Sequence, residues 1–153
     1  KNVIALAAGI ADGLGLGDNT KAALVTRGMV EMARLGAALG AQIPTFSGLS
    51  GMGDLFVTAF SKHSRNSWAG RELGKGRALK EIMESTKMVI EGVATAEAAY
   101  MLSKKLNVEM PITSVTYQVL YENVPPRDGV RKLMERVRTH EMEEVITGTY
   151  SWE

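Results

Sequence analysis

The chain of 153 residues contains no cysteine, which excludes disulfide bridges and thiolate metal sites. Its two histidines, His63 and His140, lie too far apart for the short ligand spacings of metal sites, so we expect both at the surface and no bound metal. No apolar run is long enough to span a bilayer. The formal net charge of +1 provides no basic excess for nucleic-acid binding. We therefore expect a cytoplasmic protein that neither inserts into a membrane nor binds nucleic acid.

Hydrophobic residues instead recur with the period of an α-helix along most of the chain. A first helix is indicated by a single apolar stripe, which consists of Val3, Leu6, Ala7 and Ile10. A second helix is expected to run to about Leu39, and further helices at about 51–61, 66–73, 79–85, 91–106, 111–124 and 130–137. Strand alternation is nearly absent. The sequence therefore predicts one all-α domain over residues 1–153, with the structure after about residue 140 left open.

Single residues indicate where some of these helices end. Asp18 or Asn19 is expected to cap the second helix, because a short side-chain oxygen can accept hydrogen bonds from the free amides of a first turn. Pro111 suits the first turn of a helix, where its missing N–H group has no partner to lose. Pro125 and Pro126 are expected to end that helix.

The stretch ADGLGLGDNTKAAL at 11–24 raises the question of a nucleotide-binding loop. A dinucleotide loop needs G-x-G-x-x-G between a strand and a helix. Here Gly13 and Gly15 are followed by Asp18 at the third required position, where a carboxylate would repel a phosphate. The preceding segment also has a helical period, and no Gly-Lys-Ser/Thr follows. We therefore interpret the stretch as a joint between two helices, in which glycines permit backbone angles that other residues resist.

Several separated motifs resemble one enzyme family. They are KNVIALAAGIADGLGLGDNTKAAL at 1–24, SGLSGMGDLFVT at 47–58, SRN at 64–66 and VIEG at 89–92. In this order they are similar to the NAD(P)-dependent glycerol-3-phosphate dehydrogenases of the bacterial type, which interconvert dihydroxyacetone phosphate and sn-glycerol 3-phosphate. The resemblance covers essentially the whole chain and implies a helical substrate-binding domain like the C-terminal domain of 6-phosphogluconate dehydrogenase. Because a Rossmann domain precedes this domain in the family, the chain looks like the second domain alone.

Hydride transfer to a ketone leaves an alkoxide, so the reaction needs a proton donor. A lysine can serve if burial or positive neighbours lower its pKa. Taken alone, Lys1 has the features of a solvated ammonium, and the resemblance makes it the catalytic acid and base. Asp54 taken alone suits a helix N-cap, and Thr58 lies one turn later on the same face. The resemblance implies that Lys1, Asp54 and Thr58 share the substrate site.

Ser64, Arg65 and Asn66 have the residue types of a phosphate site. A guanidinium can hold a phosphate through two parallel hydrogen bonds, and a helix start adds backbone donors. From these residues alone a solvated helix cap is the more common interpretation, whereas the resemblance implies that they contact the substrate phosphate. It also implies that Arg65, Val89 and Glu91 contact NAD or NADP, which the family binds mainly through its Rossmann domain. Glu91 alone suits the start of a helix, because of the helix dipole.

The resemblance implies an oxidoreductase that feeds glycerophospholipid synthesis and is a homodimer as the full-length enzyme. The 153-residue chain alone is expected to be inactive, since nothing in it can hold the cofactor pyrophosphate. Two alternatives stay open: a helical interaction or scaffolding module without catalysis, and a related β-hydroxyacid dehydrogenase, which Arg65 and Asn66 disfavour because they suit a phosphate. Lys21 and Arg71 are left outside the site, Lys21 as a surface lysine.

Overall fold

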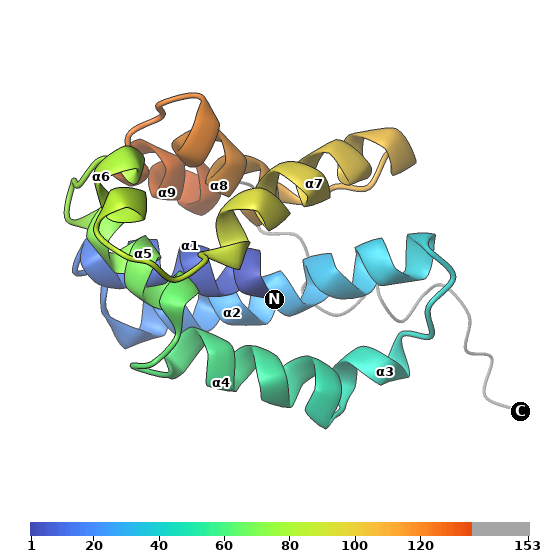
Figure 1. The fold of residues 1–153 in the computed structure, drawn as a ribbon. Helices are drawn as coiled ribbons and strands as arrows, with labels where there is room; N and C mark the ends of the chain where they lie inside the picture. The colour runs from blue at the N-terminus through green and yellow to red at the C-terminus, as the bar shows by residue number, and fades with distance from the viewer. Residues whose placement is uncertain (136–153) are drawn as a thin grey trace, which may run out of the picture.

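The structure is a computed structural model that describes residues 1–135, and in that range every regular element is a helix (Figure 1). The helices are α1 (Asn2–Gly13), α2 (Gly17–Ala38), α3 (Pro44–Ser47), the π-helical turn η1 (Leu49–Gly53), α4 (Asp54–Phe60), α5 (Arg65–Gly74), α6 (Leu79–Glu84), α7 (Glu91–Leu106), α8 (Pro111–Tyr121) and α9 (Pro126–Glu135). The all-α prediction is confirmed. The predictions for Val137, His140 and the tail lie outside the described residues.

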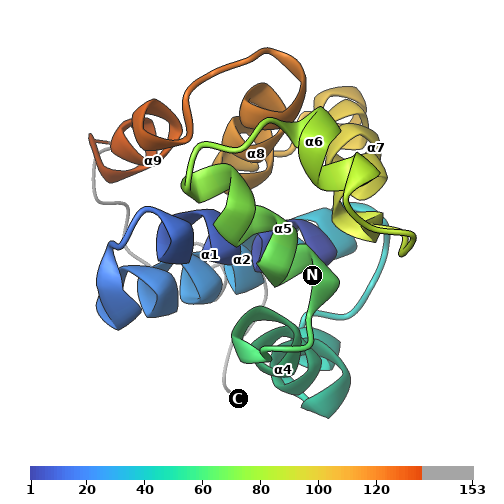
Figure 2. The same ribbon diagram turned by 60° about the vertical axis from the view of Figure 1, so that its left-hand side comes forward.

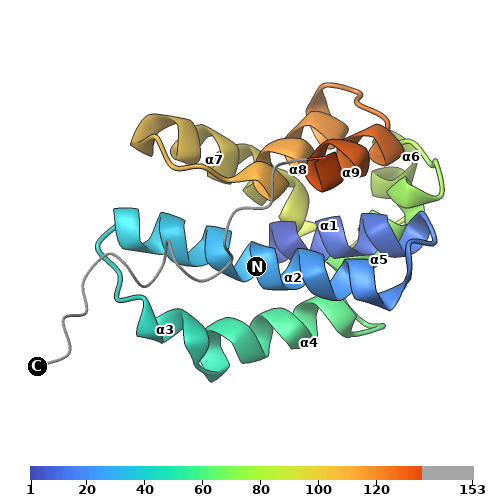
Figure 3. The same ribbon diagram turned by 180° about the vertical axis from the view of Figure 1, so that it is seen from behind.

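Helix α1 lies at the centre of the bundle. Seen from the front and from behind, α7, α8 and α9 lie on one side of the α1 and α2 layer, and α3 and α4 lie on the other (Figures 1 and 3). Every residue from Val3 to Ala11 is buried. One core cluster joins Ile4 and Ala8 to α2, α4 and α8, and a second joins Leu6 and Ile10 to α5, α6 and α7. The sequence predicted one apolar stripe on this helix, but apolar residues surround it because it has neighbours on all sides.

Glycines allow α1 and α5 to touch backbone to backbone (Figure 2). A Cβ atom on Gly9 would lie 2.2 Å from the carbonyl oxygen of Ser67, and a Cβ atom on Gly70 would lie 2.0 Å from that of Leu6. Gly13 lies equally close to Arg71, four residues further along both helices, so the two helices run parallel. Parallel packing brings the starts of α1 and α5 to the same end of the bundle.

The joint between α1 and α2 differs in detail from the prediction. Gly15 and Gly17 adopt positive φ angles of 72° and 78°, which agrees with the interpretation of a glycine joint. The prediction that Asp18 or Asn19 caps α2 is wrong, because the helix already begins at Gly17 and its N-cap position makes no side-chain hydrogen bond. Gly13 is still part of α1, where it serves the contact with α5.

Other helix ends follow the sequence more closely. Helix α7 has the predicted bounds, and α8 begins at Pro111 as expected. No helix passes through Pro125, but Pro126 begins α9, where proline suits a first turn. The helix expected from about residue 51 begins at Asp54, after the π-helical turn. Among the described helices, none is long and apolar enough to cross a membrane.

Candidate active site where three helices begin

The first residue of the chain forms an ion pair with the first turn of α4. The Nζ of Lys1 donates a hydrogen bond to Oδ2 of Asp54. The two side chains are 45% and 38% exposed, so a solute can reach the pair. The interpretation of Asp54 as an N-cap is wrong, since Gly53 occupies the cap position and no side-chain cap bond forms there. The carboxylate holds an ammonium instead.

A second set of polar contacts begins at Asn2. The Nδ2 of Asn2 donates to Oε2 of Glu91 at 3.0 Å, and Nη2 of Arg65 lies 3.4 Å from Oε1 of the same carboxylate. Lys1 and Arg65 are 64 residues apart in the sequence, yet they are joined here through consecutive residues and one shared glutamate. The structure therefore brings both ends of the predicted site to one region of the bundle.

Residues 64–66, at the start of α5, contact the first turn of that helix and the start of α7. The Oγ of Ser64 accepts a hydrogen bond from the backbone N–H of Ser67 at 3.2 Å, so it is the N-cap of the helix. Asn66 is buried, and its Oδ1 accepts from the N–H of Gly92 at 2.8 Å. A Cβ atom on Gly92 would lie 2.8 Å from that oxygen and 3.0 Å from the carbonyl oxygen of Asn2. The starts of α1, α5 and α7 therefore converge, and the dipoles of these helices favour an anion there.

Two predicted residues lie less directly in this arrangement. The hydroxyl of Thr58 donates to the backbone carbonyl of Asp54 at 2.6 Å, so its proton is directed at the backbone of α4 rather than at Lys1. Val89 precedes α7 by two residues and is 68% exposed. Val89 therefore lies on the open surface near the start of the helix that carries Glu91.

Sequence reasoning missed Asn2 and Gly92, and it misplaced Lys21. Lys21 was expected at the surface, but it is only 7% exposed. Its Nζ lies 3.5 Å from Oδ2 of Asp12 and 4.8 Å from the centre of the Phe60 ring, and these contacts compensate its burial. The helical spacing of Lys21 with Leu24 and Gly28, both buried on α2, is the signal that could have indicated this position.

The first turn of α8 donates hydrogen bonds to a buried carboxylate that the sequence analysis did not single out. Glu31 on α2 is 3% exposed and accepts hydrogen bonds from the backbone N–H and the hydroxyl of Thr113 at 3.1 and 3.0 Å. It also accepts from the backbone N–H of Ile112. Burial raises the pKa of Glu31 to about 7, although these hydrogen bonds act in the opposite direction. Its position between α2 and α8 is structural and separate from Lys1 and Arg65.

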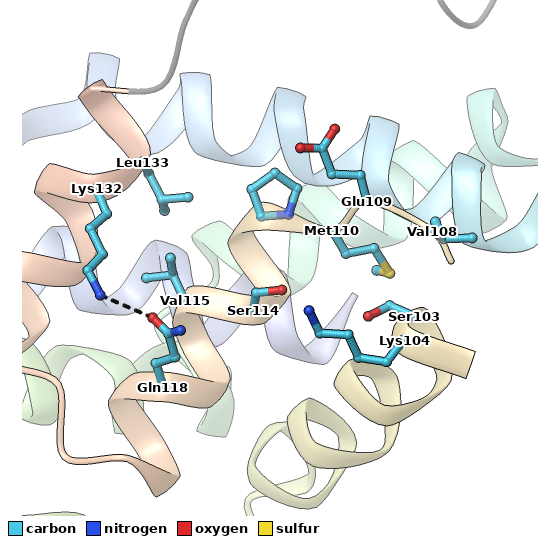
Figure 4. Close-up of a pocket in the computed structure, with 11 residues that line it drawn as sticks. Ser103, Lys104, Val108, Glu109, Met110, Ser114, Val115, Gln118, Lys132 and Leu133 are labelled. Carbon is cyan, nitrogen blue, oxygen red and sulfur yellow. Dashed lines mark hydrogen bonds between the residues drawn. The ribbon is translucent and has the colours of Figure 1, made fainter. Parts of the chain in front are cut away.

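A hollow of about 380 Å³ lies between α7, α8 and α9, away from the predicted site residues (Figure 4). Lys104 and Lys132 reach into it from opposite sides, and Lys132 contacts Oε1 of Gln118 at 3.4 Å. None of the residues predicted for the substrate or the cofactor lines this hollow. Within residues 1–135, no three histidine, aspartate or glutamate side chains gather so that they could hold a metal ion.

Residues 1–131 match the protein family described as NAD-dependent glycerol-3-phosphate dehydrogenase C-terminus. The chain is 58% identical over 146 residues to a protein from an Exiguobacterium species named glycerol-3-phosphate dehydrogenase (NAD(P)+), with 95% of this chain and 43% of that protein covered. A protein of the same name from Bacillus mycoides is 59% identical over 145 residues, with the same shares covered.

A solved structure shows the same arrangement of helices. The crystal structure of a glycerol-3-phosphate dehydrogenase from Coxiella burnetii is 41% identical and superimposes with a TM-score of 0.86, covering 88% of this chain and 42% of that one. The chain thus spans less than half the length of these relatives. The match over residues 1–131 and the shared fold lead to one conclusion: the chain belongs to the family of the C-terminal domain of NAD-dependent glycerol-3-phosphate dehydrogenase.

Proposed function

We propose that this chain is the substrate-binding part of an enzyme that interconverts dihydroxyacetone phosphate and sn-glycerol 3-phosphate with NAD(P)H. The observation that carries the proposal is the meeting of Lys1 and Arg65 through Asn2 and Glu91. Dihydroxyacetone phosphate has a C2 oxygen to protonate and a phosphate to anchor, and this region offers a cation for each. A scaffolding module has no need of such a set, and the relatives cited above are all named as the dehydrogenase.

The ammonium of Lys1 is the proton donor in this proposal. When the ketone is reduced, a hydride adds to C2 and Lys1 transfers one proton to the C2 oxygen, while the neutral amine takes that proton back in the reverse reaction. Asp54 keeps the ammonium in place through the ion pair. Thr58 helps to hold the backbone of Asp54, because its hydroxyl donates a hydrogen bond to the carbonyl of that residue.

The substrate phosphate is placed at the start of α5. The side chain of Arg65 is 43% exposed, and its contact with Glu91 engages Nη2 alone of a guanidinium that carries five N–H donors. Ser64 and Asn66 flank it in the first turn, where the helix dipole also favours an anion. Glu91 orients the guanidinium in the absence of substrate, and a bound phosphate would accept from the remaining guanidinium donors, which offset the repulsion from that carboxylate.

The exposed residues around α7 fit a dinucleotide. Arg65, Val89 and Glu91 are 43%, 68% and 55% exposed, and they offer a cation for phosphate oxygens, an apolar surface and an acceptor for hydroxyl groups. When bound, the nicotinamide supplies the hydride. We place the cofactor contacts of this chain at these three residues, and the cofactor is NAD or NADP, with most of its contacts outside this chain.

Calorimetric titration of the chain with sn-glycerol 3-phosphate tests this assignment. Arg65→Ala should weaken binding about tenfold to a hundredfold, since hydrogen bonds to charged groups contribute about 1.5–3 kcal/mol. Arg131→Ala is the matched control, because Arg131 also pairs with a carboxylate, Asp128 at 2.8 Å, but lies on α9. Equal affinity of the wild-type chain and the Arg65→Ala variant would contradict the assigned phosphate site.

We also propose that the complete enzyme is a cytoplasmic homodimer. Helix α4 and η1 expose a stripe of large apolar side chains, which is typical of an association surface. The stripe consists of Leu49, Met52, Phe56, Val57 and Phe60. Val57→Lys should lower the sedimentation coefficient of a dimeric sample to that of a monomer, whereas Met88→Lys, also exposed but next to α7, should not. A wild-type protein that sediments as a monomer at all concentrations would exclude the dimer.

A further inference from the structure

We infer that Arg71 is a positioning residue that holds the phosphate-binding turn of α5 in register with α4, acting through Ser67 and fixed by Asp12. The inference rests on the proposed function, because it assigns a role toward the same substrate. The guanidinium of Arg71 contacts Ser67 and Asp12 rather than Lys1, Asp54 or the proposed phosphate anchor Arg65. Its effect on substrate must therefore pass through its neighbours.

Ser67 connects the two helices. It is completely buried, and it lies one turn after the cap residue Ser64, whose Oγ accepts its backbone N–H. The Oγ of Ser67 accepts a hydrogen bond from Nη1 of Arg71 at 3.0 Å and donates one to the carbonyl oxygen of Ala59 at 3.3 Å. Because a hydroxyl has one proton, the guanidinium on its acceptor side leaves that proton directed at Ala59. Arg71 thereby determines the direction of the Ser67 hydroxyl.

The bond from Ser67 to Ala59 spans the connection between α4 and α5. Ala59 belongs to the last turn of α4, the helix that begins with Asp54 and its ion pair to Lys1. Ser67 belongs to the first turns of α5, which begins with Arg65. One hydroxyl therefore sets the spacing between the helix that holds the proposed proton donor and the helix that holds the proposed phosphate anchor.

Asp12 pairs with the same guanidinium nitrogen that donates to Ser67. Its Oδ2 lies 3.7 Å from Nη1 of Arg71 and 3.5 Å from Nζ of the buried Lys21. Gly13 allows this approach, since a Cβ atom there would lie 2.2 Å from the backbone oxygen of Arg71. Lys21 lies in turn over the ring of Phe60, the residue after Ala59. The cluster therefore links α1, α2, α4 and α5 around one guanidinium that is 24% exposed.

Binding of sn-glycerol 3-phosphate to the 153-residue chain, measured by calorimetry, tests the role of Arg71. Arg71→Met should weaken binding about fivefold, the equivalent of one hydrogen bond. Arg71→Lys should restore most of the affinity, because an ammonium can still donate to Ser67 and pair with Asp12. Arg77→Met is the matched control. Arg77 follows the end of α5 and pairs with Glu72 of that helix at 2.8 Å, so its replacement should leave the affinity unchanged.

A double variant separates positioning from general loosening of the fold. In the Arg65→Ala background, Arg71→Met should have no further effect, since the anchor it positions is already gone. Additive losses would overturn the inference. Ser67→Ala removes the midpoint of the connection with little change in volume, and it should weaken binding as much as Arg71→Met. It serves as the test if the Arg71→Met variant does not fold.

Amide hydrogen exchange without ligand distinguishes this inference from the proposed function. Arg71→Met should accelerate exchange of the Ser67 amide while leaving the amide of Ile82, buried on α6, unchanged. Unchanged exchange at Ser67 would overturn the inference whether or not the substrate binds. Faster exchange with unchanged affinity would overturn the link to substrate. If the wild-type chain fails to bind sn-glycerol 3-phosphate and the Ser67 amide still responds, the proposed function fails while the contact between helices stands.

Discussion

Replacement of Gly70 by alanine tests the parallel contact of α1 and α5. The added Cβ atom would lie 2.0 Å from the carbonyl oxygen of Leu6, 2.8 Å from the N atom of Ile10 and 2.9 Å from the Cα atom of Gly9. All three neighbours belong to the backbone, so no side-chain rotation can relieve the clash. The two helices must separate by about 1 Å to restore van der Waals contact, in an interior that is packed as closely as a crystal.

The cost of Gly70→Ala can be estimated from two opposing effects. Overpacking of a well-filled core costs about 1–3 kcal/mol, and the steric conflict here is at the upper end because only the backbone can move. Alanine recovers about 1 kcal/mol of helix propensity relative to glycine. We therefore expect Gly70→Ala to lower the free energy of unfolding by about 2 kcal/mol, measured by urea denaturation followed by circular dichroism.

A glycine in an open position provides the control. Gly48 has a φ of −87°, and the nearest atom to its missing Cβ lies 3.8 Å away. Gly48→Ala should therefore leave the free energy of unfolding within about 0.5 kcal/mol of the wild type. If Gly70→Ala is no more destabilising than Gly48→Ala, the close parallel contact of α1 and α5 is wrong, together with the convergence of helix starts that depends on it.

Three further predictions concern single positions and the whole chain. The pKa of Glu31 is raised from 4.5 to about 7 in the folded state, so its contribution to stability is fully present below pH 4.5 and is lost as pH rises through 7. The unfolding free energy should thus fall by up to about 3 kcal/mol across that range, and Glu31→Gln should flatten this slope in denaturation series at several pH values. Gly92→Ala should weaken binding of sn-glycerol 3-phosphate in calorimetry, because the new Cβ atom would displace Asn66 or Asn2; unchanged affinity would contradict the role of that close contact. The chain of 153 residues should not oxidise NADH in the presence of dihydroxyacetone phosphate, and turnover by it would refute the proposal that most cofactor contacts lie outside this chain.

The sequence predicts well the features that depend on local chemistry. Both ends of α7 are predicted because Glu91 suits a helix start and the apolar period stops at Leu106, after which Asn107 adopts the left-handed conformation of a helix cap. Proline at the first turn of α8 is equally local. Each of these signals lies within a few residues of the structure that it determines.

Features that depend on distant partners could not be predicted in the same way. Lys21 and Glu31 are of charged types that usually lie at the surface. The burial of Lys21 becomes favourable through Asp12, nine residues away, and that of Glu31 through Thr113, 82 residues away. The stripe on α1 was also incomplete, because the alanines that surround Ile4 on its second face have little hydrophobic signal. Local periodicity records which residues are apolar, but it does not record which other helix they will meet.

In the proposed site, partners that are distant in the sequence orient the side chains. Lys1 and Arg65 each have a carboxylate of their own, Asp54 and Glu91, so two cations can stand near one another without uncompensated repulsion. Asn2 then joins the pairs, because its amide donates to the carboxylate that holds Arg65. The side chains are therefore oriented before any substrate arrives, and little reorganisation remains for binding. The same reasoning explains why motifs at 1–24, 47–58, 64–66 and 89–92 occur in one chain: each motif supplies a partner that another needs.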